Sequence, residues 1–229
     1  MTPTSLAIIP ARGGSKRIPR KNIRLFLGKP VIAHSIAAAL ESGLFDEVMV
    51  STDDDEIAEI ARKYGAAVPF MRSKNNADDI ATTADVLLEV IERYLADGMS
   101  FDYCACIYPV TPLLNSELLR ESFRRFRQSK AEALVPVVRY SHPIQRAIQI
   151  DDRGRAGFIN PEYRLTRTQD LPPRFHDAGQ FYYLRIKSFL QHRQLVPNDT
   201  LAYELSEATV QDLDNESDWK MAEIKYTAR

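Results

Sequence analysis

The sequence predicts an α/β protein built on a three-layer, doubly wound, mostly parallel sheet with a small inserted flap. Over the first 130 residues, short apolar runs alternate with amphipathic segments, which is the pattern of consecutive β-α-β units. Residues 103–108 form a nearly continuous apolar run, typical of a strand in a sheet that helices cover on both faces. A chain of 229 residues suits one large domain, so residues 1–229 are expected to fold as a single unit.

Strands are predicted where short apolar runs stand between turn residues, and helices where apolar residues recur every three or four positions. The predicted strands are residues 6–10, 47–51, 67–70, 103–108, 133–138 and 181–186. The predicted helices are residues 31–41, 54–64, 84–95, 116–126 and 216–226. Gly43 and Gly65 follow two of these helices as expected C-caps, and Ser116 is the expected N-cap of another.

The alternation ends after residue 138. Residues 139–178 contain four prolines and two short strand-like pieces, 147–150 and 156–159, but no good helical pattern. A stretch of this kind inside a compact domain is usually functional or packs against something else. We therefore predict a flap or dimerisation arm over residues 139–178, with a plain surface excursion as the alternative.

The charge of the chain is unevenly distributed. The net charge is −1, but residues 1–40 carry +7 and no acid, which leaves −8 for the remainder. A local cationic segment indicates a small anionic ligand and argues against nucleic acid followed along a whole face. The alternative is a basic helix start whose lysines are simply solvated.

The sequence supports neither a membrane-spanning segment nor a disulfide bond. We find no apolar run long enough to cross a bilayer and no signal-peptide core, so no membrane partner is expected. Cys104 and Cys106 lie two apart in one predicted strand and face the same side, a poor geometry for a disulfide. We interpret them as reduced core residues of a cytoplasmic protein.

The most informative segment is residues 9–22, which read Ile-Pro-Ala-Arg-Gly-Gly-Ser-Lys-Arg-Ile-Pro-Arg-Lys-Asn after a predicted strand. The spacing matches neither the P-loop nor the dinucleotide-binding glycine motif. The backbone N–H groups of Gly13, Gly14 and Ser15 are suited to cradling phosphate oxygens, with countercharge from neighbouring cations. Those cations, the candidate catalytic residues of this segment, are Arg12, Lys16 and Lys21.

A second candidate site is Asp212-Leu213-Asp214. In an extended segment, residues two apart project to the same side, and a carboxylate pair suits Mg²⁺, which keeps several waters and bridges phosphate oxygens. An EF-hand loop starting at Asp212 is disfavoured because Ser217 stands where the turn requires glycine. Capping of the final helix by these acids is the remaining alternative.

The basic segment resembles the signature of the sugar-activating cytidylyltransferases, the CMP-sialic acid synthetases and their relatives for other nine-carbon keto-acid sugars. The matching residues are Pro10, Ala11, Arg12, Gly14, Ser15, Lys16, Pro19, Lys21 and Asn22, and the resemblance continues from residue 8 to residue 226. It implies a nucleotidyltransferase fold of Rossmann-like type, with CTP and a nine-carbon keto-acid sugar as substrates. It also implies Mg²⁺ held by Asp212 and Asp214, and a homodimer in which the flap reaches the partner.

By the same resemblance, further residues are expected to contact the nucleotide. The expected nucleotide-binding set is Ala11, Arg12, Gly13, Gly14, Ser15, Asn22, Arg72, Thr82, Thr83 and Tyr108. The sugar carboxylate calls for arginine, because its planar fork binds carboxylates in bidentate fashion. The expected sugar-binding set is Arg167, Arg174, His176, Asp177 and Gln180, although a loop that satisfies its own polar groups is an alternative.

The resemblance also points to a substrate branch. Tyr108 stands where the neuraminic acid enzymes carry glutamine, and Asp177-Ala178-Gly179 differs from their segment, which has asparagine before the glycine. Residues 141–146 and 176–182 instead resemble the branch acting on pseudaminic acid. Legionaminic or neuraminic acid, 3-deoxy-octulosonic acid, and a non-catalytic nucleotide sensor remain as alternatives. The expected reaction is in-line attack of the anomeric hydroxyl on the α-phosphorus without a covalent enzyme intermediate, with either Asp177 or a metal-bound hydroxide as general base.

Overall fold

The computed structural model describes residues 3–15, 17–76 and 80–229, so the predicted catalytic residue Lys16 lies outside the described residues. The helices are α1 (Val31–Ser42), α2 (Asp55–Lys63), α3 (Thr83–Ala96), α4 (Ser116–Gln128), α5 (Ile186–His192) and α6 (Glu216–Thr227). The strands are β1 (Ser5–Pro10), β2 (Leu25–Phe26), β3 (Lys29–Pro30), β4 (Glu47–Ser51), β5 (Tyr103–Ile107), β6 (Ala133–Arg139), β7 (Ile148–Ile150), β8 (Ala156–Phe158), β9 (Phe175–Asp177), β10 (Phe181–Arg185) and β11 (Thr200–Leu205).

The main sheet has the strand order β11-β6-β10-β5-β1-β4, and β9 extends the ladder along β6. β1 is parallel to β4 and β5, and β11 is parallel to β6, whereas β10 and β9 run antiparallel to their neighbours. The prediction of a mostly parallel sheet is therefore confirmed. Its carboxyl edge, where β1, β4 and β5 end, is the expected place for a ligand in such a sheet.

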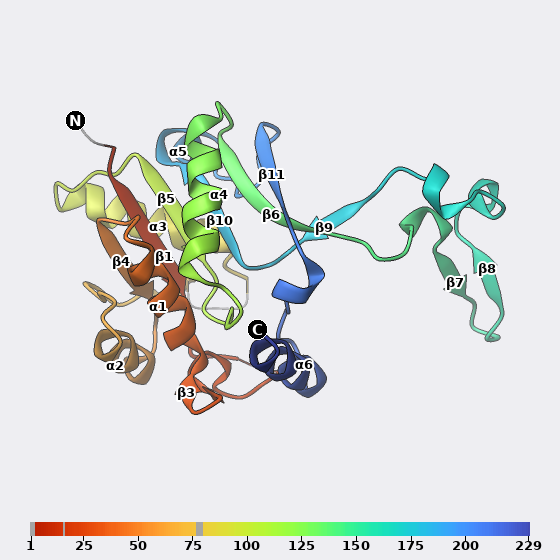
Figure 1. Cartoon of the computed structure of the whole chain (residues 1–229). Helices are drawn as coiled ribbons and strands as arrows, with labels where there is room; N and C mark the ends of the chain where they lie inside the picture. The colour runs from red at the N-terminus through yellow and green to blue at the C-terminus, as the bar shows by residue number, and fades with distance from the viewer. Residues whose placement is uncertain (1–2, 16, 77–79) are drawn as a thin grey trace.

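The sheet is covered on both faces, because successive side chains of β1 enter different apolar clusters. Ala7 and Ile9 pack with residues of α1, α2 and α4, while Leu6 and Ile8 pack with residues of α3 and α5. Figure 1 shows α1 and α4 together on one face, with α3 beyond the sheet. Cys104 and Cys106 are buried and free, as predicted. Among the described residues, no helix has the length and apolar character that crossing a membrane demands.

Several local predictions need correction. Residues 67–70 form no strand; Ala67 makes one isolated bridge to Met49. The N-cap of α4 is Asn115, whose side chain accepts a hydrogen bond from the Leu118 backbone, so the Ser116 assignment was wrong by one residue. Sequence patterns also missed the short elements β2, β3, β9 and α5 and the edge strand β11, because these pieces are short or their polarity alternates weakly.

The segment 139–178 leaves the sheet at the end of β6 and returns through β9, which pairs with β6 from Val137 to Arg139. Between these strands it carries short 3-10 turns and the hairpin β7–β8. Figure 1 shows this hairpin at the far end of an arm that extends away from the sheet. We call residues 139–178 the arm.

Candidate active site

The glycine-rich loop connects β1 to the β2–β3 hairpin across the carboxyl edge of the sheet. Its start is held to the end of β4, because the Ala11 N–H donates to the Ser51 carbonyl at 2.9 Å. The Gly13 N–H then donates to Oδ1 of Asp53 at 3.0 Å. The sequence therefore folds the loop over the adjacent parallel strands β1 and β4, as expected for a ligand site of this fold class.

Gly13 is required by a close approach. A Cβ atom at this position would lie 2.7 Å from Oδ2 of Asp54, which is too short for any side chain. Asp54 stays in place because it caps α2 and because Arg20 makes a two-point contact with its carboxylate. The hydrogen bond from Arg20 is also the main reason that the pKa of Asp54 is lowered.

Asn22 stabilises the glycine-rich loop through a buried hydrogen bond. It is buried, and its Nδ2 donates to the Arg12 carbonyl at 2.8 Å. This contact gives Asn22 a role in shaping the loop, although sequence comparison had predicted a direct nucleotide contact. Ser15 N–H likewise donates within the loop, to the Gly13 carbonyl at 3.0 Å, whereas Gly14 is exposed and its N–H has no acceptor among the residues described.

A cavity of about 240 Å³ opens beside the loop, at the ends of β1 and β5. It gathers four of the predicted nucleotide-binding residues. Its lining is Pro10, Arg12, Arg72, Asn76, Ala81, Thr83, Val86 and Tyr108. Thr82 does not line it; its hydroxyl accepts from the Asp85 N–H as the N-cap of α3. Asn76 was not predicted, and no sequence pattern marked it.

Arg72 and Tyr108 line the same cavity with side chains of different charge. Arg72 is buried, and its guanidinium donates to the hydroxyl (3.0 Å) and carbonyl (2.5 Å) of Ser51. Burial lowers the pKa of Arg72, but an arginine remains charged at neutral pH. Burial raises the pKa of the Tyr108 phenol, which stays neutral and lies 3.5 Å from Oγ1 of Thr83. The cavity thus offers a fixed cation and a neutral aromatic surface.

The C-terminal aspartates meet the glycine-rich loop in space. Nζ of Lys21 donates to the Leu213 carbonyl at 2.8 Å and lies 3.4 Å from Oδ1 of Asp214. Arg17 pairs with Oδ2 of the same carboxylate at 2.5 Å. Two predicted sites almost 200 residues apart in the chain therefore form one surface.

The capping alternative for the two aspartates is excluded by the start of α6. Asn215 is the N-cap, and Asp218 completes the capping box, so neither Asp212 nor Asp214 is used to cap the helix. Desolvation, followed by the neighbouring Asp214 carboxylate, raises the pKa of Asp212. Among the described residues, no group of three metal-ligating side chains occurs, so a metal at this place would have these two carboxylates as its protein ligands. Two hard oxygen donors that leave positions for water and phosphate fit Mg²⁺.

A small apolar cluster keeps the loop and the aspartates together. Ile18 of the loop and Leu213 between the aspartates pack with Phe26 of β2 and Trp219 of α6, all nearly inaccessible to solvent. Arg24 strengthens this junction, since it pairs with Glu216 and lies 4.5 Å over the Trp219 ring. The register between the two charged segments is therefore set by buried packing.

A second cavity, of about 340 Å³, is lined by two of the predicted sugar-binding residues and by Asp212. Its lining includes His176, Asp177, Gly179, Gln211 and Asp212. Asp177 is oriented twice: its Oδ1 accepts from the Gly179 N–H at 2.8 Å, and its Oδ2 accepts from the Tyr182 hydroxyl at 2.6 Å. Tyr182 was missed as a site residue, because the turn between β9 and β10 is what brings it to Asp177.

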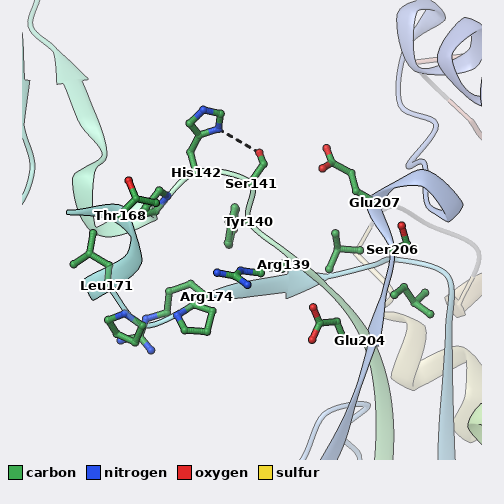
Figure 2. A pocket seen from close by; sticks show the side chains of 15 residues that line it. Arg139, Tyr140, Ser141, His142, Thr168, Leu171, Arg174, Glu204, Ser206 and Glu207 are labelled. Carbon is green, nitrogen blue, oxygen red and sulfur yellow. Dashed lines mark hydrogen bonds between the residues drawn. The ribbon is translucent and has the colours of Figure 1, made fainter. Parts of the chain in front are cut away.

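The other predicted sugar residues lie elsewhere. Gln180 is buried at the start of β10, and its Oε1 has no hydrogen-bond partner among the residues described. Arg167 lies on the arm and pairs with Asp170 at 2.8 Å. Arg174 lines a third cavity, where the arm joins the sheet; Figure 2 shows it beside Arg139, with glutamates of the β11 side opposite. Within one chain, therefore, neither arginine reaches the aspartate pair.

This fold and site define a nucleotide-using transferase of the α/β class: a cationic glycine loop, a nucleotide-sized cavity and a carboxylate pair share one sheet edge. The chain belongs to the cytidylyltransferase family, whose model matches residues 6–226.

The chain is 41% identical to the pseudaminic acid cytidylyltransferase of Campylobacter jejuni, over 97% of this chain and 96% of that protein. It is 32% identical to the CMP-N,N'-diacetyllegionaminic acid synthase of Legionella pneumophila, over 95% and 94% of the two chains. In fold it resembles CMP:2-keto-3-deoxy-manno-octonic acid synthetase solved with CTP, with a TM-score of 0.72, 18% identity, and coverage of 98% and 99%.

Proposed function

We propose that this protein is a CTP-dependent cytidylyltransferase that activates a nonulosonic acid, and that pseudaminic acid is its substrate. The observation that carries the proposal is the contact of Lys21 with the Asp214 segment, because it joins the glycine-rich loop to a carboxylate pair at one sheet edge. The identity of 41% with a pseudaminic acid enzyme over nearly the full length of both chains supports the choice of sugar.

In this mechanism the triphosphate lies along the glycine-rich loop, with Arg12, Lys16 and Lys21 neutralising its charge. The base enters the cavity between Arg72 and Tyr108, whose volume of about 240 Å³ accommodates a pyrimidine. Asp212 and Asp214 hold Mg²⁺, which when bound stabilises the charge that develops on the α-phosphate and on departing pyrophosphate.

The sugar occupies the cavity that His176 and Asp177 share with Asp212. Its anomeric hydroxyl attacks the α-phosphorus and gives up its proton to a base, the new C–O–P linkage forms, and pyrophosphate leaves with the electron pair of the broken P–O bond. Because both oxygens of Asp177 already accept hydrogen bonds, its role is to orient sugar hydroxyl or acetamido groups. Each oxygen keeps a second lone pair, so Asp177 remains a candidate to take the proton of the anomeric hydroxyl.

The proposal includes a homodimer. The arm extends from the sheet and exposes Ile148, Ile150 and Leu165, and such apolar surface is normally covered in an assembly. Arg167 lies on this arm, away from the aspartate pair of its own chain, and in a dimer it becomes available to the partner's sugar cavity. A cytoplasmic location is part of the proposal, because the reaction consumes CTP and both cysteines are free thiols.

The experiment that tests the function is pyrophosphate release with CTP and Mg²⁺, run in parallel on four acids: pseudaminic, legionaminic, neuraminic and 3-deoxy-octulosonic. Selective turnover of pseudaminic acid is expected. Preference for another acid would overturn the sugar assignment and keep the reaction. Binding of CTP without turnover of any acid would contradict catalysis and indicate a nucleotide sensor.

A further inference from the structure

The cations that follow the glycines have different partners. Arg20 pairs with Asp54 and Glu56 at the start of α2, and Arg24 pairs with Glu216 at the start of α6. These two arginines hold pieces of the fold together. Arg17 pairs instead with Asp214, one of the two proposed metal ligands.

The Arg17 contact is on the surface and is not needed to hold the segment. The Arg17 side chain is 69% exposed, whereas Lys21 is 20% exposed and already ties the segment through the Leu213 carbonyl. The apolar cluster around Trp219 fixes the same segment from below. Removal of the Arg17 side chain should therefore leave the fold and the position of Asp214 intact.

The ion pair has to break when the substrates bind. Oδ2 of Asp214 lies against Arg17 and Oδ1 faces Lys21, so both carboxylate oxygens are engaged by cations. A divalent ion on Asp214 would repel the guanidinium at this distance. A triphosphate on the adjacent loop then offers a new anion, and arginine suits phosphate because it donates two parallel hydrogen bonds.

We propose that Arg17 is an exchangeable phosphate ligand: it occupies Asp214 in the free protein and moves to the terminal phosphates of the nucleotide when Asp214 takes the metal. The inference rests on the proposed function of the same site. It makes binding of metal and nucleotide mutually dependent, because each partner releases a group that the other requires.

The proposal predicts effects of opposite sign in Arg17→Gln. Without nucleotide, Mn²⁺ should bind about threefold more tightly, since an exposed ion pair that competes for Asp214 is worth up to about 1 kcal/mol. The Mg²⁺ complex of CTP should bind roughly tenfold more weakly, through the loss of a charged hydrogen-bond donor. Calorimetry or Mn²⁺ electron paramagnetic resonance on the intact protein gives the first value, and calorimetry gives the second.

Arg124→Gln is the matched control, because Arg124 is an exposed arginine that pairs with Glu121 on α4 and the charge change is the same. Fluorescence of Trp219, the single tryptophan, checks that the junction beside Asp214 is unchanged in each variant. Weaker binding of both ligands, or unchanged binding of either, overturns the exchange. Since no sugar is present, the result can be read even if every sugar acid fails as a substrate.

Discussion

The carboxyl edge of the sheet carries charged side chains that pair with one another, whereas the arm carries exposed apolar side chains. At the edge, charged side chains from distant segments satisfy one another, as Lys21 does with the Asp214 segment and Arg20 with Asp54. On the arm, Ile148, Ile150 and Leu165 are 55%, 75% and 85% exposed. The charged groups named at the edge are paired within the chain, whereas these apolar groups of the arm are left exposed to solvent. A sequence motif therefore identified the edge directly, whereas no motif marked the apolar surface of the arm.

The largest effect is expected at the edge, for Asp212→Ala. If this carboxylate holds Mg²⁺, its removal should lower kcat roughly thousandfold, because a catalytic metal supplies several kcal/mol to the transition state. Pyrophosphate release under saturating CTP and Mg²⁺ measures the change. Asp152→Ala, an exposed aspartate of the arm, is the control. Near-normal turnover would remove Asp212 from the site.

Lys21→Ala tests the connection between the loop and the aspartates. It removes a phosphate countercharge together with the hydrogen bond to the Leu213 carbonyl. We expect kcat/KM for CTP to fall about a hundredfold, in line with the loss of a hydrogen bond to a charged group and some misalignment. Lys29→Ala, an exposed lysine of the nearby β3, serves for comparison. An unchanged rate at low CTP would contradict the phosphate role.

The double change Ile148→Asp with Ile150→Asp tests the arm. Charges on two exposed hairpin residues should leave the sheet folded but convert a dimer into a monomer, because desolvating carboxylates in an apolar contact is unfavourable. Sedimentation measures the mass, and Ile224→Asp on α6 provides an exposed isoleucine outside the arm. A wild-type protein that is fully active as a monomer would contradict the dimer proposal.

A smaller effect is expected for Tyr108→Gln. Tyr108 packs edge-to-face against Tyr182, which in turn holds Asp177, so this change disturbs the nucleotide and sugar cavities at their junction. We expect preference among the four sugar acids to shift by about tenfold, since one altered polar contact is worth about 1 kcal/mol. Ratios of kcat/KM measure the shift, with Tyr108→Phe separating the hydroxyl from the ring. Identical ratios in all three proteins would exclude Tyr108 from specificity.

The smallest effect concerns pH and Asp54. The hydrogen bond from Arg20 lowers the pKa of Asp54, so this carboxylate stabilises the fold above its unfolded pKa, near 4. The contribution is lost as the pH falls through the lower folded value. In Asp54→Asn, we expect the free energy of unfolding at pH 7 to drop by about 0.5–1 kcal/mol, as for a partly exposed ion pair. Denaturant unfolding should show the difference shrinking towards pH 2; a constant difference would contradict this assignment.

Sequence patterns predicted most of the central sheet because buried parallel strands are short and strongly apolar. The range 47–51 was correct at both ends, and Gly43 does end α1 in the left-handed conformation. Residues 67–70 were misassigned because a short apolar run does not reveal whether a neighbouring strand has room for it. The edge strand β11 was missed because only Leu205 in it is buried and its pairing with β6 is entirely long-range.

The sequence by itself determined the fold class, the family and the residue types of the proposed phosphate and metal sites, because those depend on local spacing and chemistry. Only the tertiary structure decided which groups meet. Asn22 donates a hydrogen bond to the Arg12 carbonyl, and Thr82 caps a helix. Tyr182 donates a hydrogen bond to Asp177, and Arg17 pairs with Asp214. The Arg17–Asp214 contact joins segments that the chain keeps far apart, and the buried cluster around Trp219 sets their register, so no local pattern contains it. The other three contacts lie within about ten residues of one another in the chain, but they depend on turns that the sequence pattern did not resolve.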